Sequence, residues 1–157
     1  MTEKMILALD IGGTNIRAAL IDENIRIIKR TEIACDLKET PDTLIDRLLK
    51  KADIKKEKIS SVGIGCPGPL DIKNGIMLTP PSLPEWRGFQ IKKRFEEKYG
   101  CNVTVQNDAN AAGYAEAVLG AGKDFNSVYY VTVSTGIGGA FVYNKNLVSG
   151  AFGVAGE

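Results

Sequence analysis

The chain has 157 residues, of which 44% are hydrophobic and 25% are charged, and 20 basic residues nearly balance 19 acidic ones. These proportions are typical of one globular domain, or of one lobe with the start of another, and exclude a disordered tail or a collagen-like repeat. A membrane protein is also excluded, because no apolar run approaches the roughly 18 residues of a spanning helix. The balanced charge shows no basic bias that would indicate a dedicated nucleic-acid surface. The amino-terminal segment lacks the features of a signal peptide, so we expect a cytoplasmic protein.

Histidine and cysteine usage restricts the possible chemistry. The chain contains no histidine, so a general base within it must be a carboxylate or a less usual group, and Ser-His or Cys-His catalysis is excluded. Cys35, Cys66 and Cys101 are odd in number and far apart. This spacing favours reduced thiols over a disulfide framework or a zinc site.

The first half of the chain predicts a meander of strands followed by a helix and a further strand. Three apolar segments separated by tight turns predict antiparallel strands; they are residues 5–11, 15–21 and 25–34. Pro41 begins a helix that extends to about residue 52 on an apolar stripe. Residues 59–66 form a buried strand, and a loop rich in proline and glycine follows over 67–88, with a short hairpin at 71–78.

The second half predicts two more helices and a hairpin. A helix extends from about residue 88 to 99, a short strand covers 103–106, and an alanine-rich helix runs from Asn107 to about 119. A hairpin begins at about residue 127. Because two strands cannot hold a core by themselves, we expect residues 1–122 to form one lobe and residues 123–157 to begin a second.

Two glycine-rich turns between predicted strands are candidate phosphate sites. In the first, residues 10–15, Gly12 and Gly13 let backbone amides approach an anion, and Thr14 adds a hydroxyl donor. Asp10, at the end of the strand, suits Mg²⁺ directly or through water. The alternative is an ordinary hairpin turn, in which aspartate and glycine are common.

The second turn, residues 134–139, repeats this pattern with Thr135 and Gly136. A phosphate chain held between two lobes needs a donor loop from each, so the pair of turns is more informative than either one. An ordinary hairpin turn remains the alternative here too.

Asn107 and Asp108 begin the alanine-rich helix. Both residue types are favoured at helix N-caps, which is the structural interpretation. The functional interpretation is a carboxylate that accepts a proton from a substrate hydroxyl. That role suffices for phosphoryl transfer, in which positioning and charge stabilisation contribute most of the catalysis.

Taken together, these segments resemble the ROK sugar kinases of the hexokinase and actin superfold. The resemblance covers the chain in order through LALDIGGTNIRAALID (7–22), GIGCPGPLD (63–71), SLPEWRGFQI (82–91), VQNDANAAGYAE (105–116), VSTGIGGAFV (133–142) and GVAGE (153–157). It implies an α/β fold of the ribonuclease H-like or actin-like ATPase type. Such a fold has a lobe built on a mixed five-stranded sheet with flanking helices, followed here by the first hairpin of a truncated second lobe.

The resemblance also implies roles for individual residues. Asp108 is then the base that takes the proton from the 6-hydroxyl of a hexose, while Asn107 and Glu157 hydrogen-bond other sugar hydroxyls. ATP is held by residues of both glycine turns, namely Asp10, Gly12, Gly13, Thr14, Asn15, Thr135 and Gly136. Asp10 also helps to place Mg²⁺.

The implied activity is ATP-dependent phosphorylation of a hexose, with glucose first and a homodimer as the assembly. The family's histidine and its cysteine-rich zinc motif have no counterpart in this chain, so we expect an N-terminal fragment that is inactive by itself. One alternative is a kinase for N-acetylmannosamine, N-acetylglucosamine or fructose. The others are a sugar-responsive ROK repressor without its DNA-binding domain and a non-catalytic actin-like or chaperone-like module.

Overall fold

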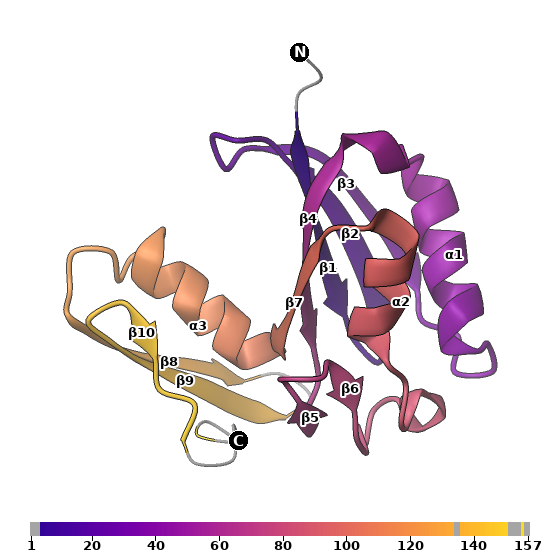
Figure 1. The fold of residues 1–157 in the computed structure, drawn as a ribbon. Coiled ribbons are helices and arrows are strands. Elements are labelled where there is room, and N and C mark those ends of the chain that lie inside the picture. The colour runs from indigo at the N-terminus through magenta and orange to yellow at the C-terminus, as the bar shows by residue number, and fades with distance from the viewer. Residues whose placement is uncertain (1–3, 134–135, 151–154, 156–157) are drawn as a thin grey trace. The chain divides into compact units, whose positions relative to one another are not determined.

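A mixed five-stranded sheet organises the first part of the chain in the computed structural model, which describes residues 4–133, 136–150 and 155 (Figure 1). Its strands are β1 (Met5–Ile11), β2 (Asn15–Ile21), β3 (Ile27–Ala34), β4 (Ile59–Cys66) and β7 (Asn102–Asn107), in the order β3-β2-β1-β4-β7. β1, β2 and β3 pair antiparallel, and β1 pairs parallel with β4. The predicted meander and mixed five-stranded sheet are therefore confirmed.

Two helices cover one face of this sheet, α1 (Pro41–Ala52) and α2 (Ile91–Tyr99) (Figure 1). Thr40 caps α1 by accepting a hydrogen bond from the Thr43 amide at 3.3 Å, and Pro41 occupies the first turn, where its missing N–H costs nothing. The stripes predicted from the sequence are buried in one hydrophobic core together with alternate residues of β1. The residues that face the sheet include Leu44, Ile45, Leu48 and Leu49 of α1 and Ile91, Phe95 and Tyr99 of α2.

The two helices are also joined by ion pairs. Arg94 of α2 contacts Asp42 at 2.5 Å and Asp46 at 2.9 Å, both on α1. Lys98 lies 3.5 Å from Asp46. This network fixes the helices against each other above the apolar layer that they share.

The segment between β4 and α2 is an ordered loop built from short elements. These are β5 (Leu70–Asp71), β6 (Ile76–Met77) and the 3₁₀ turn η2 (Pro84–Trp86), while a second 3₁₀ turn, η1 (Lys56–Lys58), precedes β4. Trp86 is 1% exposed and meets Phe89 edge-on with ring centroids 5.5 Å apart. The tryptophan therefore anchors the loop to the core.

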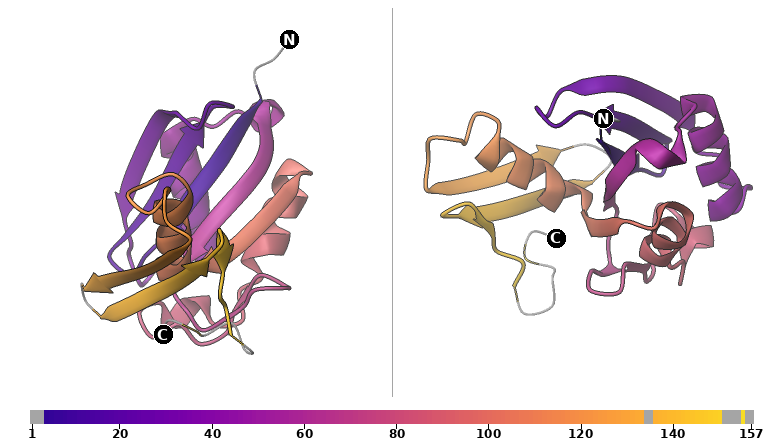
Figure 2. Two further views of the ribbon diagram at one scale, coloured as in Figure 1. Left: turned by 90° about the vertical axis from the view of Figure 1, so that its left-hand side faces the viewer. Right: turned by 45° about the horizontal axis from the view of Figure 1, so that its top comes forward.

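Helix α3 (Asp108–Val118) packs on a second sheet, made of β8 (Ser127–Val133), β9 (Ile137–Tyr143) and β10 (Asn146–Leu147). Figures 1 and 2 show α3 lying along one face of β8 and β9. Gly113 permits this contact, because a Cβ atom there would lie 2.5 Å from the Cβ of Ala140 and 2.9 Å from that of Tyr130. On the opposite face the strands expose large apolar side chains, among them Tyr129, Val131, Val133, Ile137, Phe141 and Tyr143.

Several boundaries differ from the prediction for local reasons. The third strand begins at Ile27 rather than 25, because Ile25 has a φ of 60° in a turn closed by Asp22. The second helix begins at Ile91 rather than 88, because the preceding residues follow η2 into a turn. The two-residue strand β10 and both 3₁₀ turns are too short to give a periodic signal.

The chain divides into two compact units between Val105 and Gln106. Unit 1 holds most of the five-stranded sheet with α1 and α2, and unit 2 holds α3 with β8, β9 and β10. This division groups α3 with the hairpin. The boundary expected from the sequence lies after α3 instead, between residues 122 and 123. None of the helices in the described part of the chain combines the length and the apolar character that a membrane crossing requires.

Candidate functional site

The first glycine turn joins β1 to β2 in unit 1. The Gly12 amide donates to the carbonyl of Asn15 at 3.0 Å, which closes the turn, and the carbonyl of Thr14 accepts from the Cys35 amide at 2.8 Å. The amides of Gly13 and Thr14 find no acceptor among the residues that the structure describes. Two unpaired amides beside an exposed threonine form a concavity of hydrogen-bond donors that suits an anion.

Gly13 lies against the loop that contains Trp86. A Cβ atom at position 13 would be 2.9 Å from both the Cβ and the backbone oxygen of Ser82. A larger residue at this position is therefore incompatible with the packing of the loop on the turn. The structure thus joins the first glycine turn to the start of the SLPEWRGFQI segment, which the sequence treated separately.

Asp10 belongs to a row of charged side chains across three strands. Its Oδ2 accepts a hydrogen bond from Arg17 Nη1 at 2.8 Å, and Arg17 Nε donates to Glu32 Oε2 at 2.6 Å. The hydrogen bonds to Asp10 and then to Glu32 raise the pKa of the Arg17 guanidinium. The side chains of Asp10 and Arg17 are 50% and 33% exposed, so the row is accessible to a ligand.

In unit 2, β7 passes directly into α3, which positions Asn107 and Asp108 at the start of the helix. Asn107 is the N-cap, and its Oδ1 accepts from the Asn110 amide at 3.0 Å. Asp108 is exposed, and its Oδ1 accepts from the Ala109 amide at 2.8 Å. The capping interpretation is therefore confirmed for Asn107, while Asp108 presents its second oxygen without a donor from the described residues.

The described part of the second glycine turn, residues 136–139, lies beside this end of α3. A Cβ atom on Gly138 would be 3.1 Å from the Cβ of Ala109, so the beginning of β9 packs on the first turn of the helix. Gly136 precedes β9, and a Cβ atom built on it would meet no atom within 4 Å. Thr135 and Glu157, which the sequence also predicted as site residues, lie outside the described residues.

Three residues near these groups were not predicted as site residues. Arg17 and Ser82 contact or adjoin the first turn. Asn110 is only 2% exposed, and its Oδ1 has no partner among the residues that the structure describes. Asp10 and Arg17 are partners in the register of β1 and β2, two strands that the sequence predicts to be antiparallel neighbours. The sequence therefore contained information about this contact. The contact of Ser82 with Gly13 depends on tertiary packing and had none.

The first turn suits a magnesium nucleotide. Magnesium commonly keeps several waters and takes only one or two protein carboxylates beside the phosphates, which fits the single carboxylate of Asp10. Within residues 4–133, 136–150 and 155, no three histidine, cysteine, aspartate or glutamate side chains come together as a metal cluster. The amides of Gly13 and Thr14 supply the donors for phosphate oxygens.

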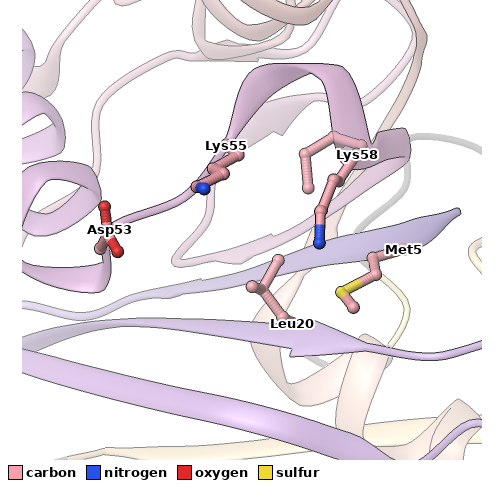
Figure 3. Close-up of a pocket in the computed structure, with 6 residues that line it drawn as sticks. Met5, Leu20, Asp53, Lys55 and Lys58 are labelled. Atoms are coloured by element: carbon pink, nitrogen blue, oxygen red, sulfur yellow. The ribbon is translucent and has the colours of Figure 1, made fainter. Parts of the chain in front are cut away.

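A cavity of about 150 Å³ lies elsewhere in unit 1 (Figure 3). Its lining combines the apolar side chains of Met5, Leu20 and Ile59 with the charged side chains of Asp53, Lys55 and Lys58. Met5 begins β1 and Asp10 lies near its other end, so the cavity is separate from the glycine turn. It contains none of the predicted site residues.

Comparison with known proteins identifies the family. The sequence pattern of the ROK family matches residues 6–157. The chain belongs to the ROK family. This confirms the resemblance inferred from the motifs, and the neighbouring ROK structures confirm the actin-like ATPase fold class.

Individual relatives are sugar kinases. This ROK chain is 32% identical over 155 residues to the glucokinase of Streptomyces coelicolor, covering 98% of this chain and 48% of that protein. It is 35% identical to the N-acetylmannosamine kinase of Salmonella newport, over 96% of this chain and 52% of the relative. A ROK glucokinase of Streptomyces griseus, solved with glucose and AMPPNP, superposes with a TM-score of 0.82 at 35% identity, over 98% of this chain and 49% of the other. The chain thus spans about half the length of these relatives.

Proposed function

We propose that the protein carrying this chain is an ATP-dependent sugar kinase, which transfers the γ-phosphate to the 6-hydroxyl of a hexose, with glucose as the first candidate. The observation that carries the proposal is the exposed Asp108 carboxylate at the start of α3, a helix whose next residue, Ala109, packs against Gly138 of the second glycine turn. The relatives named glucokinase, and the Streptomyces griseus enzyme bound to glucose and AMPPNP, support this assignment.

In the proposed reaction, Asp108 accepts the proton of the 6-hydroxyl. That oxygen forms a bond to the γ-phosphorus, the bond from this phosphorus to the β,γ-bridging oxygen breaks, and ADP leaves. Asn107 and Glu157 hydrogen-bond other hydroxyls of the sugar. The hydrogen bond from the Ala109 amide holds one oxygen of Asp108 and so orients the other toward the substrate.

ATP is assigned to the two glycine turns. Gly12, Gly13, Thr14 and Asn15 contribute from the first turn, and Thr135 and Gly136 from the second. Asp10 helps to hold Mg²⁺, which when bound offsets negative charge on the phosphates. The unpaired amides of Gly13 and Thr14 and the single accessible carboxylate of Asp10 support this assignment.

N-acetylmannosamine is a second candidate for the sugar substrate, because a relative named N-acetylmannosamine kinase is 35% identical to this chain. N-acetylglucosamine and fructose complete the panel to be tested. From the family resemblance we further propose that the protein is a cytoplasmic homodimer. We also propose that residues 1–157 alone do not catalyse the phosphorylation of sugar. A ROK repressor would instead bind a sugar and phosphorylate none.

The test measures ADP release with each of the four sugars. It uses the 157-residue chain and a chimera in which this chain is followed by the C-terminal half of the Streptomyces coelicolor glucokinase. The chimera should phosphorylate one sugar, and Asp108→Asn should lower its kcat at least about 100-fold, the size of a general-base contribution. Sugar binding, measured by calorimetry, should persist because the substitution keeps the side-chain shape.

Asp124→Asn is the matched control, since it makes the same change at an exposed position of unit 2 and should leave kcat intact. An unchanged kcat in Asp108→Asn would remove Asp108 as the base. Failure of both proteins to phosphorylate any of the four sugars would overturn the kinase assignment. Turnover by the 157-residue chain alone would contradict only its proposed inactivity.

A further inference from the structure

Asp10, Arg17 and Glu32 occupy one cross-strand row beside the first glycine turn. Asp10 pairs with Arg17 in the β1–β2 register, and Arg17 pairs with Glu32 in the β2–β3 register. Directly paired residues point to the same face of a sheet, so the three side chains meet without any special loop geometry. The row lies on the face opposite to the one that α1 and α2 cover, because the intervening residues Leu9 and Ile11 are buried in the core.

Arg17 holds one oxygen of Asp10 and leaves the other available. The guanidinium reaches Asp10 Oδ2 through Nη1 and Glu32 through Nε, at 2.8 and 2.6 Å. Among the described residues, no group donates to Asp10 Oδ1. On the other flank, the β4 partner of Asp10 is Gly65, which has no side chain to compete with Arg17. Asp10 is therefore fixed from one side only.

Glu32 keeps this anchor from cancelling the charge of Asp10. An arginine beside a lone aspartate gives a neutral pair, which attracts a divalent cation weakly. With Glu32 on its other side, the row of two carboxylates and one guanidinium retains one negative charge. The side chains of Arg17 and Glu32 are 33% and 43% exposed, so solvent screens their charges. The ion pair therefore contributes more to the orientation of the guanidinium than to the stability of the fold.

We propose that Arg17 is a positioning residue for the magnesium nucleotide: braced by Glu32, it fixes the carboxylate of Asp10 at the first glycine turn while leaving one oxygen free and the row negatively charged. This inference rests on the proposed kinase function and deepens it. The role is distinct from structural support, because it acts through the orientation of Asp10 and should change the requirement for Mg²⁺.

The test is a cycle of three variants in the form of the protein that phosphorylates sugar. Arg17→Met removes the anchor and adds negative charge, Glu32→Gln keeps the anchor and removes charge, and the double variant Arg17→Met/Glu32→Gln removes the anchor at constant net charge. Calorimetry with AMPPNP measures the Mg²⁺ concentration for half-maximal nucleotide binding. Steady-state kinetics measure kcat and the KM values for ATP and sugar.

The comparison of the wild type with the double variant isolates positioning. We expect the half-maximal Mg²⁺ concentration to rise about three- to tenfold, the ratio expected when one side chain must be immobilised on binding. The KM for sugar should stay unchanged. Arg17→Lys should recover part of the effect, because an ammonium can reach Asp10 but cannot bridge two carboxylates as a planar guanidinium does.

Arg47→Met/Glu39→Gln is the control, because it removes a similar exposed ion pair of unit 1, with an N–O distance of 3.1 Å. It should leave the Mg²⁺ requirement unchanged. If the double variant at positions 17 and 32 matches the wild type in nucleotide binding, or loses only thermal stability, the positioning role is wrong while the kinase assignment stands. If the wild type binds no magnesium nucleotide and phosphorylates no sugar, both proposals fail.

Discussion

Replacing Gly113 by alanine tests how closely α3 approaches the hairpin that carries the second glycine turn. The new Cβ would lie 2.5 Å from the Cβ of Ala140 and 2.9 Å from that of Tyr130. Both of these atoms are bonded to backbone, so no change of rotamer relieves the contact. Helix and sheet must separate by about 1 Å to restore an ordinary carbon–carbon distance.

The expected magnitude is a balance of two effects. Overpacking of a rigid contact costs up to about 3 kcal/mol. Alanine is favoured over glycine within a helix by about 1 kcal/mol. We therefore expect Gly113→Ala to destabilise unit 2 by about 2 kcal/mol, which corresponds to about a 30-fold loss of protection from hydrogen exchange in α3.

The assay compares exchange protection of α3 amides with that of α1 amides, which serve as an internal reference because α1 belongs to unit 1. Ala115→Gly is the matched control, since it reverses the same substitution at an exposed position of α3 and should cost about 1 kcal/mol from propensity alone. Removing the opposing methyl group in the double variant Gly113→Ala/Ala140→Gly should recover part of the loss. If Gly113→Ala instead stabilises α3 by about 1 kcal/mol, the close approach of helix and hairpin is refuted.

Two further predictions concern single side chains. Burial raises the pKa of Tyr99 from 10 to about 12, so the stability that its neutral phenol confers is complete below pH 10 and is lost as the pH rises to about 12. Between pH 9 and pH 12, the free energy of unfolding measured with urea should fall by about 2–3 kcal/mol less in Tyr99→Phe than in the wild type. Equal falls in the two proteins would contradict the raised pKa of Tyr99. The Lys145 ammonium donates to the carbonyls of Ala117 at 2.7 Å and of Lys123 at 2.6 Å, so Lys145→Met should destabilise unit 2 by about 1–3 kcal/mol. The exposed Lys123→Met is its control in thermal unfolding, and a loss no larger than that of this control would show that the carbonyl contacts contribute little.

Periodic apolar segments explain why most elements were predictable. The stripes of α1 and α2, and the alternation in β1 and β2, encode which face is buried, and the structure places these elements within a few residues of the prediction. The fold class required the resemblance of the motifs, and the order of the strands was not predicted. The strand β10 carries no such signal, because it has two residues and follows a tight turn at Asn144 and Lys145, both with positive φ.

The residues of the candidate site were predictable from the sequence, but most of the contacts between distant segments were not. Asp10, the glycines after it and Asp108 stand out because their residue types suit phosphate, metal and proton transfer. The cap formed by Asn107 was also foreseen from its position. The contact of Ser82 with Gly13 and the burial of Asn110 depend on how distant segments pack, which local sequence patterns do not encode.

The parallel contact between β1 and β4 determines the order in which unit 1 can assemble. β1 and β2 are joined by a short turn, whereas Met5 pairs with Ile59 only after roughly 50 residues of intervening chain. Closing so long a segment costs about 2 kcal/mol more in chain entropy than closing a turn of a few residues. The search for this pairing therefore limits the folding rate, as non-local contacts do in other α/β domains. The first glycine turn and the row of Asp10, Arg17 and Glu32 lie wholly within the fast-forming meander, so this half of the candidate site can form before the parallel strands meet.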